Sequence, residues 1–301
     1  MKSFIKEVKK HWQLYLLMIP PIVYLIIFQY LPIGGILIAF KEYDPVLGVL
    51  KSPNVGFVKF KMFFDSYYFL TTLKNTLLIS LGSLVVNSIF PVILALLINE
   101  VPNKGFKKVV QTISYAPYFI SLVVLVGMFN MFLSRTGFIN DLLQSLFKTT
   151  IDFIGDPKYF RWIYILTGLW QGIGWWSIIY VGALSNVDSS LHEAATIDGA
   201  SRLQRIWHIN LPTIKPTFIV LLIMSFGSIM SVGFEKAYLM QNAANLEVSE
   251  VIATYSYKVS FLTVKDLSFG TAIGLFNTII NFILLIIANS VSKIVTKESL
   301  F

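Results

Sequence analysis

Six stretches of the chain contain no Asp, Glu, Lys or Arg, and each has about the length of a bilayer-crossing helix. They are residues 11–40, 75–99, 109–134, 162–187, 216–234 and 267–292. An α-helix rises about 1.5 Å per residue, so roughly 20 apolar residues cross the hydrocarbon core. Backbone groups inside a bilayer need internal hydrogen bonds, which a helix supplies. The chain is therefore predicted to be an all-α, polytopic membrane protein with six transmembrane helices and both termini on the same side.

The composition excludes several other classes. The chain is 55% hydrophobic and 13% charged, whereas soluble domains carry about 25% charged residues. Its net charge of +8 comes from basic residues that flank apolar runs, which favours lipid headgroups over nucleic acid as their partner. Cysteine is absent, and the three histidines lack the spacing of metal ligands. We predict no catalytic residue and no metal site, since the H-E-x-x-H and G-x-S-x-G patterns are also missing.

Charge also predicts the orientation. If the N-terminus lies inside, the short inner segments carry half of the 24 lysines and arginines, while most acidic residues lie outside. The positive-inside rule then favours cytoplasmic N- and C-termini. In the outer loop 135–161, apolar residues at helical spacing predict a short interfacial helix over 138–147. Loop 235–266 suits either a docking partner or plain solvent. Prolines within the predicted spans favour kinks at Pro20, Pro21, Pro32, Pro91 and Pro117.

A charged segment, residues 188–212, interrupts the apolar runs. Ser190 and Glu193 fit a capping box that would start a short helix, and Gly199 can adopt a positive φ that would end it. Ser201 and Gln204 fit a second box, predicting a second helix to about residue 209. Two helices of this length are marginal alone in water, so we expect another surface to pack on them.

The spacing E-A-A-x3-G-x9-I-x-L-P in this segment resembles the coupling motif of binding-protein-dependent ABC importer permeases. The matching residues, with the Asp that precedes the Gly, are Glu193, Ala194, Ala195, Asp198, Gly199, Ile209, Leu211 and Pro212. The resemblance covers about residues 72–292. It implies an ABC importer type I permease in a bacterial cytoplasmic membrane, with residues 1–71 as tail, first helix and outer loop, 72–292 as a five-helix core, and 293–301 as a cytoplasmic tail.

The same resemblance implies partners. A second homologous permease would form a heterodimer with this chain, two ABC ATPase subunits would bind the coupling loop 188–212, and an extracytoplasmic solute-binding protein would deliver the solute. ATP and Mg²⁺ would be held by the ATPase subunits, because this chain lacks a G-x-x-x-x-G-K-[ST] loop. The chain itself is thus not expected to be an enzyme, and it needs no cofactor of its own.

The chain is more narrowly similar to permeases for saccharides, of the maltose type, and among them to those for complex or polymeric saccharides. This rests on residues 29–35, 40–41 and 233–240. Carried over by position, the family's solute contacts fall on Gly168, Gln171, Gly172, Trp175, Ser225, Ser228 and Met230. The asparagines typical of the maltose pattern are missing. The glycines also suit helix packing, and tryptophans also anchor membrane interfaces.

Alternatives remain at this point. The solute of an ABC importer can also be a peptide or amino acid, although the paired Trp175 and Trp176 favour sugar rings. A secondary transporter would usually show internal repeats and ionisable residues within its spans, and neither is visible. Glu235, at the outer end of the fifth stretch, is either a gate or partner contact or an ordinary carboxylate at headgroup level.

Overall fold

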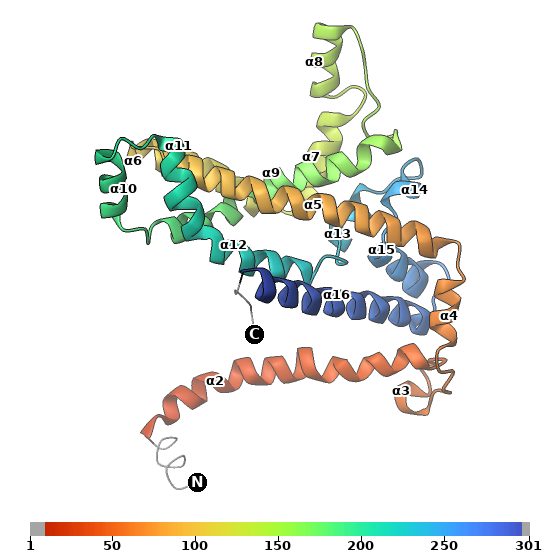
Figure 1. Cartoon of the computed structure of the whole chain (residues 1–301). Helices are drawn as coiled ribbons and strands as arrows, with labels where there is room; N and C mark the ends of the chain where they lie inside the picture. The colour runs from red at the N-terminus through yellow and green to blue at the C-terminus, as the bar shows by residue number, and fades with distance from the viewer. Residues whose placement is uncertain (1–9, 297–301) are drawn as a thin grey trace. The chain divides into compact units, whose positions relative to one another are not determined.

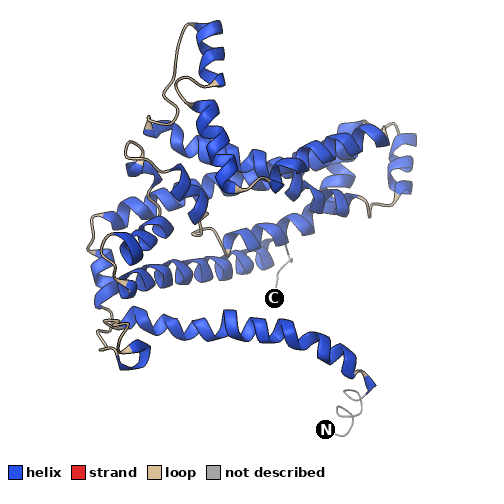
Figure 2. Ribbon diagram, turned by 180° about the vertical axis from the view of Figure 1, so that it is seen from behind, coloured by secondary structure: helices blue, strands red, loops and turns tan. Residues whose placement is uncertain are grey.

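The computed structural model describes residues 10–296, and Figures 1 and 2 show every regular element in that range as a helix. The chain divides into two compact units. A smaller unit holds residues up to 66 together with 256–276, and a larger unit holds 67–255 together with the chain from 277 onward. The last helix, α16 (Leu267–Thr296), contributes to both units. The all-α class is confirmed.

The smaller unit contains the first apolar helix, which runs from Trp12 to Phe40 as α2, η1 and η2. Buried Lys59 links two distant parts of this unit, because its ammonium lies 2.7 Å from Asp266 and 2.8 Å from Glu42. Burial works to lower the pKa of Lys59, but hydrogen bonds from its ammonium to the two carboxylates outweigh burial and raise it. The elements of this unit are α2 Trp12–Leu25, η1 Ile26–Tyr30, η2 Leu31–Phe40, α3 Gly48–Lys51, α4 Val58–Phe64 and η5 Lys258–Leu262.

The larger unit is a bundle around α5 and α9, which run side by side (Figure 1). Small residues allow the helices to approach: a side chain at Gly174 would run into the backbone of Ser114, and one at Gly82 would meet Ile165. The elements are α5 Tyr68–Asn99, α6 Lys104–Tyr115, η3 Ala116–Phe119, α7 Leu122–Leu133, α8 Phe138–Phe147, α9 Pro157–Leu184, α10 Ser189–Ile197, α11 Arg202–Arg205, η4 Ile206–Asn210, α12 Leu211–Phe226, α13 Phe234–Met240, α14 Leu246–Ser249 and α15 Ile252–Tyr257, which ends in the smaller unit.

Within residues 10–296, five helices are long and apolar enough to cross a membrane, close to the six predicted. The stretch 162–187 forms the 28-residue α9, which is not among these five helices. The stretch 109–134 is not one helix. It breaks after Tyr115 into the short turn η3, which contains Pro117, and resumes at α7. Gln171 of α9 donates to the Ile120 carbonyl at this break, at 2.9 Å, so a neighbouring helix satisfies the interrupted backbone.

The loops of the larger unit are folded. The helix predicted over 138–147 is present as α8, and the loop beyond it is held by fully buried Asn140, which accepts from the Ile151 amide at 2.7 Å. Buried Asn75 of α5 donates to the carbonyls of Glu247 and Glu250, while Arg161 donates to Asn75. Asn75 thereby ties α5 and α9 to the loop that contains α14.

Candidate functional site: a coupling loop and a polar pocket

The first coupling helix is α10, which begins earlier than predicted. Its N-cap is Asp188, whose carboxylate accepts from the Ser190 amide at 2.9 Å. The predicted capping box of Ser190 and Glu193 is therefore wrong. Asp is as good an N-cap as Ser and stands two residues upstream, so Ser190 lies inside the first turn.

Gly199 ends α10 as predicted, with φ of 77°. The Ala200 amide donates to the Ala195 carbonyl at 2.8 Å, and the Gly199 amide donates to the Thr196 carbonyl at 3.1 Å. These two bonds form a Schellman motif, which needs a left-handed residue at this position. A side chain at Gly199 would meet no neighbouring atom within 4 Å, so the requirement for glycine comes from the backbone and not from local crowding.

The second coupling helix starts as predicted and ends differently. Ser201 and Gln204 form the capping box, with the Ser201 amide donating to the Gln204 side chain at 2.7 Å. The helix does not stop near residue 209. It continues through the wider π turn η4 into α12. The π turn precedes Pro212 and relieves the clash of a proline ring with the carbonyl four residues earlier.

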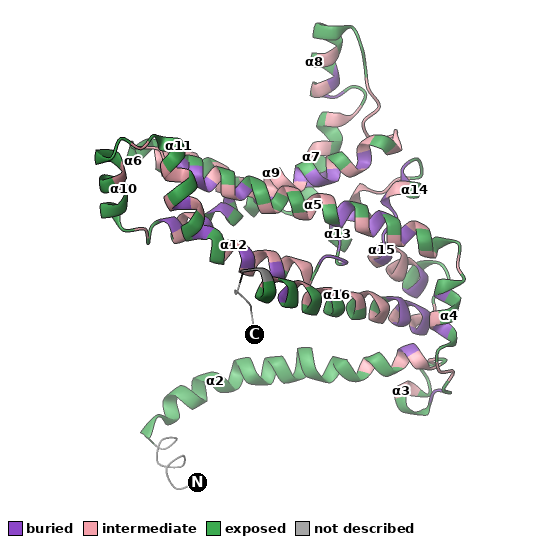
Figure 3. Cartoon of the chain, in the orientation of Figure 1, coloured by how far each residue is buried: buried purple, intermediate pink, exposed green. Residues whose placement is uncertain are grey.

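The coupling loop exposes several apolar side chains and is anchored at its base. Ile197 is 86% exposed, Leu203 68% and Trp207 66%, and Figure 3 shows α10 and α11 mostly in the colour of exposed residues. At its base, Ile206 and Leu211 pack against buried residues of α5, α9 and α12. Exposed apolar side chains on an anchored segment are typical of a docking surface.

The predicted coupling residues lie along this loop. Five are exposed and three are half-buried. The exposed ones are Glu193, Ala194, Asp198, Gly199 and Pro212, and the half-buried ones are Ala195, Ile209 and Leu211. Fully buried Asn210 adds an anchor that sequence reasoning missed, since it donates to Glu100 at 3.3 Å.

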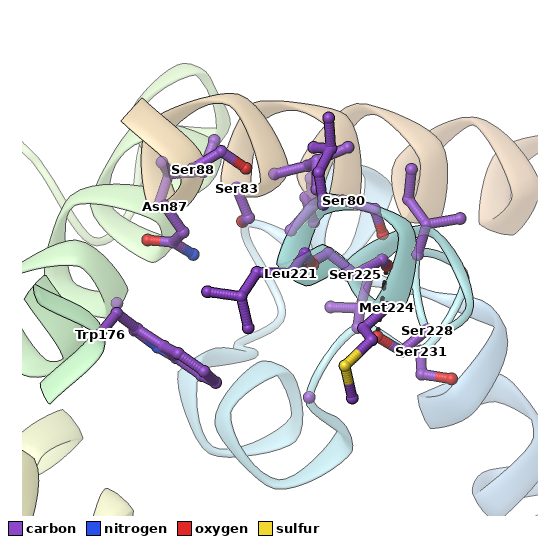
Figure 4. Close-up of a pocket in the computed structure, with 18 of the residues that line it drawn as sticks. Ser80, Ser83, Asn87, Ser88, Trp176, Leu221, Met224, Ser225, Ser228 and Ser231 are labelled. Carbon is purple, nitrogen blue, oxygen red and sulfur yellow. Dashed lines mark hydrogen bonds between the residues drawn. The ribbon is translucent and has the colours of Figure 1, made fainter. Parts of the chain in front are cut away.

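A pocket of about 520 Å³ lies in the larger unit, between α5, α9, α12 and the segment 228–236. Its size is typical of small-molecule sites. Figure 4 shows the hydroxyls of Ser80, Ser83, Ser225 and Ser231 and the amide of Asn87 around it. The lining thus combines many neutral hydrogen-bonding groups with apolar side chains.

Sequence reasoning missed the contribution of α5. Ser80, Ser83, Asn87 and Ser88 all line the pocket. Their spacing of three, four and one residues places them on one face of a helix. A polar stripe on an otherwise apolar span was the available signal, because polar groups are costly at bilayer depth unless they face a cavity. The Ser80 hydroxyl is buried and has no hydrogen-bond partner among the described residues.

The pocket is lined by four of the seven residues predicted to contact solute: Gly168, Gln171, Ser225 and Ser228. The other three lie elsewhere. Trp175 stacks on Tyr118 with ring centroids 4.5 Å apart, and Met230 is fully buried with its amide donating to Asn281 at 2.8 Å. Gly172 is buried next to Trp176, and it is Trp176 that lines the pocket. Whether any of these residues contacts solute stays a prediction.

One cation reaches this pocket. Lys236 of α13 is 6% exposed and lines the cavity together with Gly168. Its ammonium donates to the Tyr164 carbonyl at 2.7 Å and lies 4.5 Å from the centroid of the Tyr164 ring.

The chain belongs to the family described as "binding-protein-dependent transport system inner membrane component", whose sequence pattern matches residues 87–297. This family membership confirms the resemblance seen in the coupling segment. The chain is therefore a multi-pass membrane permease of an ABC importer.

Two relatives from Bacillus subtilis (strain 168) match nearly the whole chain. Protein LplB is 42% identical over 300 residues, which cover 99% of this chain and 94% of LplB. The polygalacturonan/rhamnogalacturonan transport system permease protein YteP is 41% identical over 289 residues, covering 96% of this chain and 90% of YteP. The likeness therefore includes the first helix and outer loop, which precede the residues matched by the family pattern.

A solved structure has the same fold. A chain of a bacterial ABC transporter involved in the import of the acidic polysaccharide alginate matches with a TM-score of 0.89 and 38% identity, covering 98% of this chain and 99% of that one. A second crystal structure of a bacterial alginate ABC transporter, in complex with an alginate pentasaccharide-bound periplasmic protein, matches equally well.

Proposed function

We propose that this chain is the permease subunit of an ATP-driven importer for an oligosaccharide or a polysaccharide fragment. The observation that carries the proposal is the similarity over nearly the full chain to YteP and to the alginate importer chain. The pocket supports it: hydroxyls and amides from α5, α9 and α12 surround a space next to the ring of Trp176. Such groups hydrogen-bond sugar hydroxyls, while an aromatic face packs on the sugar ring.

The partners form part of the proposal. Two ATPase subunits, which hold ATP and Mg²⁺, dock on the exposed coupling loop from the cytoplasm. A second permease completes the pathway, and a solute-binding protein delivers the saccharide from outside. Both termini and the coupling loop then face the cytoplasm. The binding protein in complex with the alginate transporter supports such an assembly.

The helices that flank the coupling loop also line the pocket, and this suggests how movement is transmitted. Tyr180 of α9 lines the pocket, and α9 ends at Leu184, four residues before the cap Asp188. After the loop, α12 follows without a break and contributes Phe218 and Ser225. When ATP binding closes the ATPases, displacement of the loop would move α9 and α12 and thereby alternate access to the pocket.

The coupling role is tested with Gly199→Asp in the full complex, reconstituted into proteoliposomes with ATP and loaded binding protein. We expect saccharide uptake to fall at least about tenfold, because a side chain at φ of 77° strains the backbone by roughly 1–2 kcal/mol and adds a charge to the docking surface. Gly182→Ala is the control, since this helical glycine also faces open space but has no positive φ. Normal uptake by correctly inserted Gly199→Asp would exclude the coupling role.

A further inference from the structure

The pocket has one charged lining residue, and nothing in the transport cycle outlined above uses it. Of the residues around the cavity, all of which the structure describes, Lys236 alone carries a charge; the others are apolar, hydroxyl-bearing or amide-bearing. A neutral sugar has no charge with which this cation could pair. The residue lies on the short helix α13, beyond the last turn of α12.

The environment of Lys236 leaves its charge without a counterion. It is 6% exposed, and none of the ion pairs formed by residues 10–296 includes it. A buried ammonium is costly unless it is paired. Here one N–H donates to the Tyr164 carbonyl, and the ring of Tyr164 lies under the charge. An ammonium has three donors, so two remain for a ligand in the pocket.

The opposing helix leaves room for this ammonium. A methyl group at Gly168 would lie 3.0 Å from the Lys236 nitrogen, which is tighter than an ordinary contact. Gly168 lines the same cavity, so the missing side chain keeps the charged group accessible from the pocket. Ser228 and Ser231 line the same cavity and add neutral donors and acceptors.

We propose that Lys236 binds a carboxylate of the solute and thereby selects saccharides that contain uronic acid residues over neutral ones. The inference rests on the proposed function, whose saccharide class it narrows. A carboxylate would supply the missing counterion and accept hydrogen bonds from the two remaining N–H groups of Lys236. The surrounding hydroxyls and amides would hold the sugar. A charge-assisted hydrogen bond in a site of low dielectric is about twice as strong as a neutral one.

The competing explanation is that Lys236 only cross-links α13 to α9 through Tyr164. Solute affinities of the purified complex in nanodiscs, measured without binding protein, separate the two roles. The probes are a galacturonate trisaccharide and its methyl ester, in which each carboxylate becomes a neutral ester with one added methyl group. The variants are Lys236→Met and Lys236→Arg, with exposed Lys51→Met as the control. Binding is followed by tryptophan fluorescence, since Trp176 lines the pocket.

We expect the wild type and Lys51→Met to bind the acid about tenfold to a hundredfold more tightly than the ester. Lys236→Met should lose this preference, and Lys236→Arg should keep most of it. Equal wild-type affinities for acid and ester would overturn the inference even if Lys236→Met does not fold. So would a Lys236→Met variant that binds both probes more weakly by the same factor.

A separate transport measurement distinguishes failure of this inference from failure of the proposed function. ATP-dependent uptake by the wild-type complex with its binding protein is measured for acidic and neutral saccharides. Uptake of neutral saccharides alone leaves the proposed function intact and removes the role of Lys236. Uptake of neither class contradicts the proposed function itself.

Discussion

The coupling loop and the pocket are built in opposite ways. The loop is one continuous segment, α10 to η4, whose caps and turn are set by neighbours in sequence and which exposes Ile197, Leu203 and Trp207. The pocket is assembled from α5, α9, α12 and residues 228–236, so its members are up to 157 positions apart between Ile79 and Lys236. A motif therefore identifies the loop, whereas the pocket depends on how the bundle packs.

The two regions also differ in what a substitution disturbs. Under the proposed function, a change on the loop surface should affect docking and leave the pocket intact, because the base of the loop is anchored separately through Ile206, Leu211 and Asn210. A change in the pocket should affect solute binding and leave the proposed docking surface intact. Substitutions in each region, tested for both solute binding and uptake, show whether this separation holds.

The largest effect is expected from Leu203→Asp on the coupling surface. Leu203 is 68% exposed, and a buried charge in place of an apolar contact at an interface costs several kcal/mol. We expect ATP-dependent uptake to fall by about a hundredfold, while solute affinity of the isolated permease stays within about twofold of the wild type. A matching loss of solute affinity would show that the two regions are not separable.

A smaller effect, on solute alone, is expected from Trp176→Ala. Trp176 lines the pocket, whereas its neighbour Trp175 stacks on Tyr118. Aromatic packing contributes about 0.5–1.5 kcal/mol beyond area burial, so affinity should fall up to about tenfold. Trp175→Phe, which keeps the stack, is the control and should bind solute normally. If Trp175→Phe lowers solute affinity and Trp176→Ala does not, then Trp175 contacts the solute, as the resemblance to the family implied.

Prediction from sequence worked where structure is local. The helix over 138–147, the positive φ of Gly199 and the capping box of Ser201 all follow from residues within a few positions of one another, and all are confirmed. The predicted start of α10 was wrong because Asp188 and Ser190 can both cap a helix, and Asp188, which comes first in the chain, is the N-cap.

Prediction was weaker where distant helices meet. Residues carried over along α9 and α12 assume one register of those helices in the bundle, and neighbouring Trp175 and Trp176 point to different surroundings. A kink at Pro117 was predicted, but not that Gln171, 51 positions away, satisfies the Ile120 carbonyl at the break. Lys236 was part of the motif quoted for the subfamily, but its burial in the cavity follows from packing against Tyr164 and not from spacing.

The smallest effect distinguishes the pocket from a merely packed interior. The Ser80 hydroxyl is buried in the pocket wall without a hydrogen-bond partner among the described residues, and an unsatisfied buried hydroxyl destabilises a fold by about 1–3 kcal/mol. If that hydroxyl forms a hydrogen bond with bound solute, Ser80→Ala should slightly raise the midpoint temperature of unfolding and weaken solute binding about threefold. Ser177→Ala is the control, because Ser177 is fully buried and already donates to the Gly174 carbonyl at 2.6 Å. It should raise neither stability nor the dissociation constant. A Ser80→Ala variant that is more stable and binds solute as tightly as the wild type would make Ser80 an ordinary packing position, and would remove α5 from the set of solute contacts at that turn.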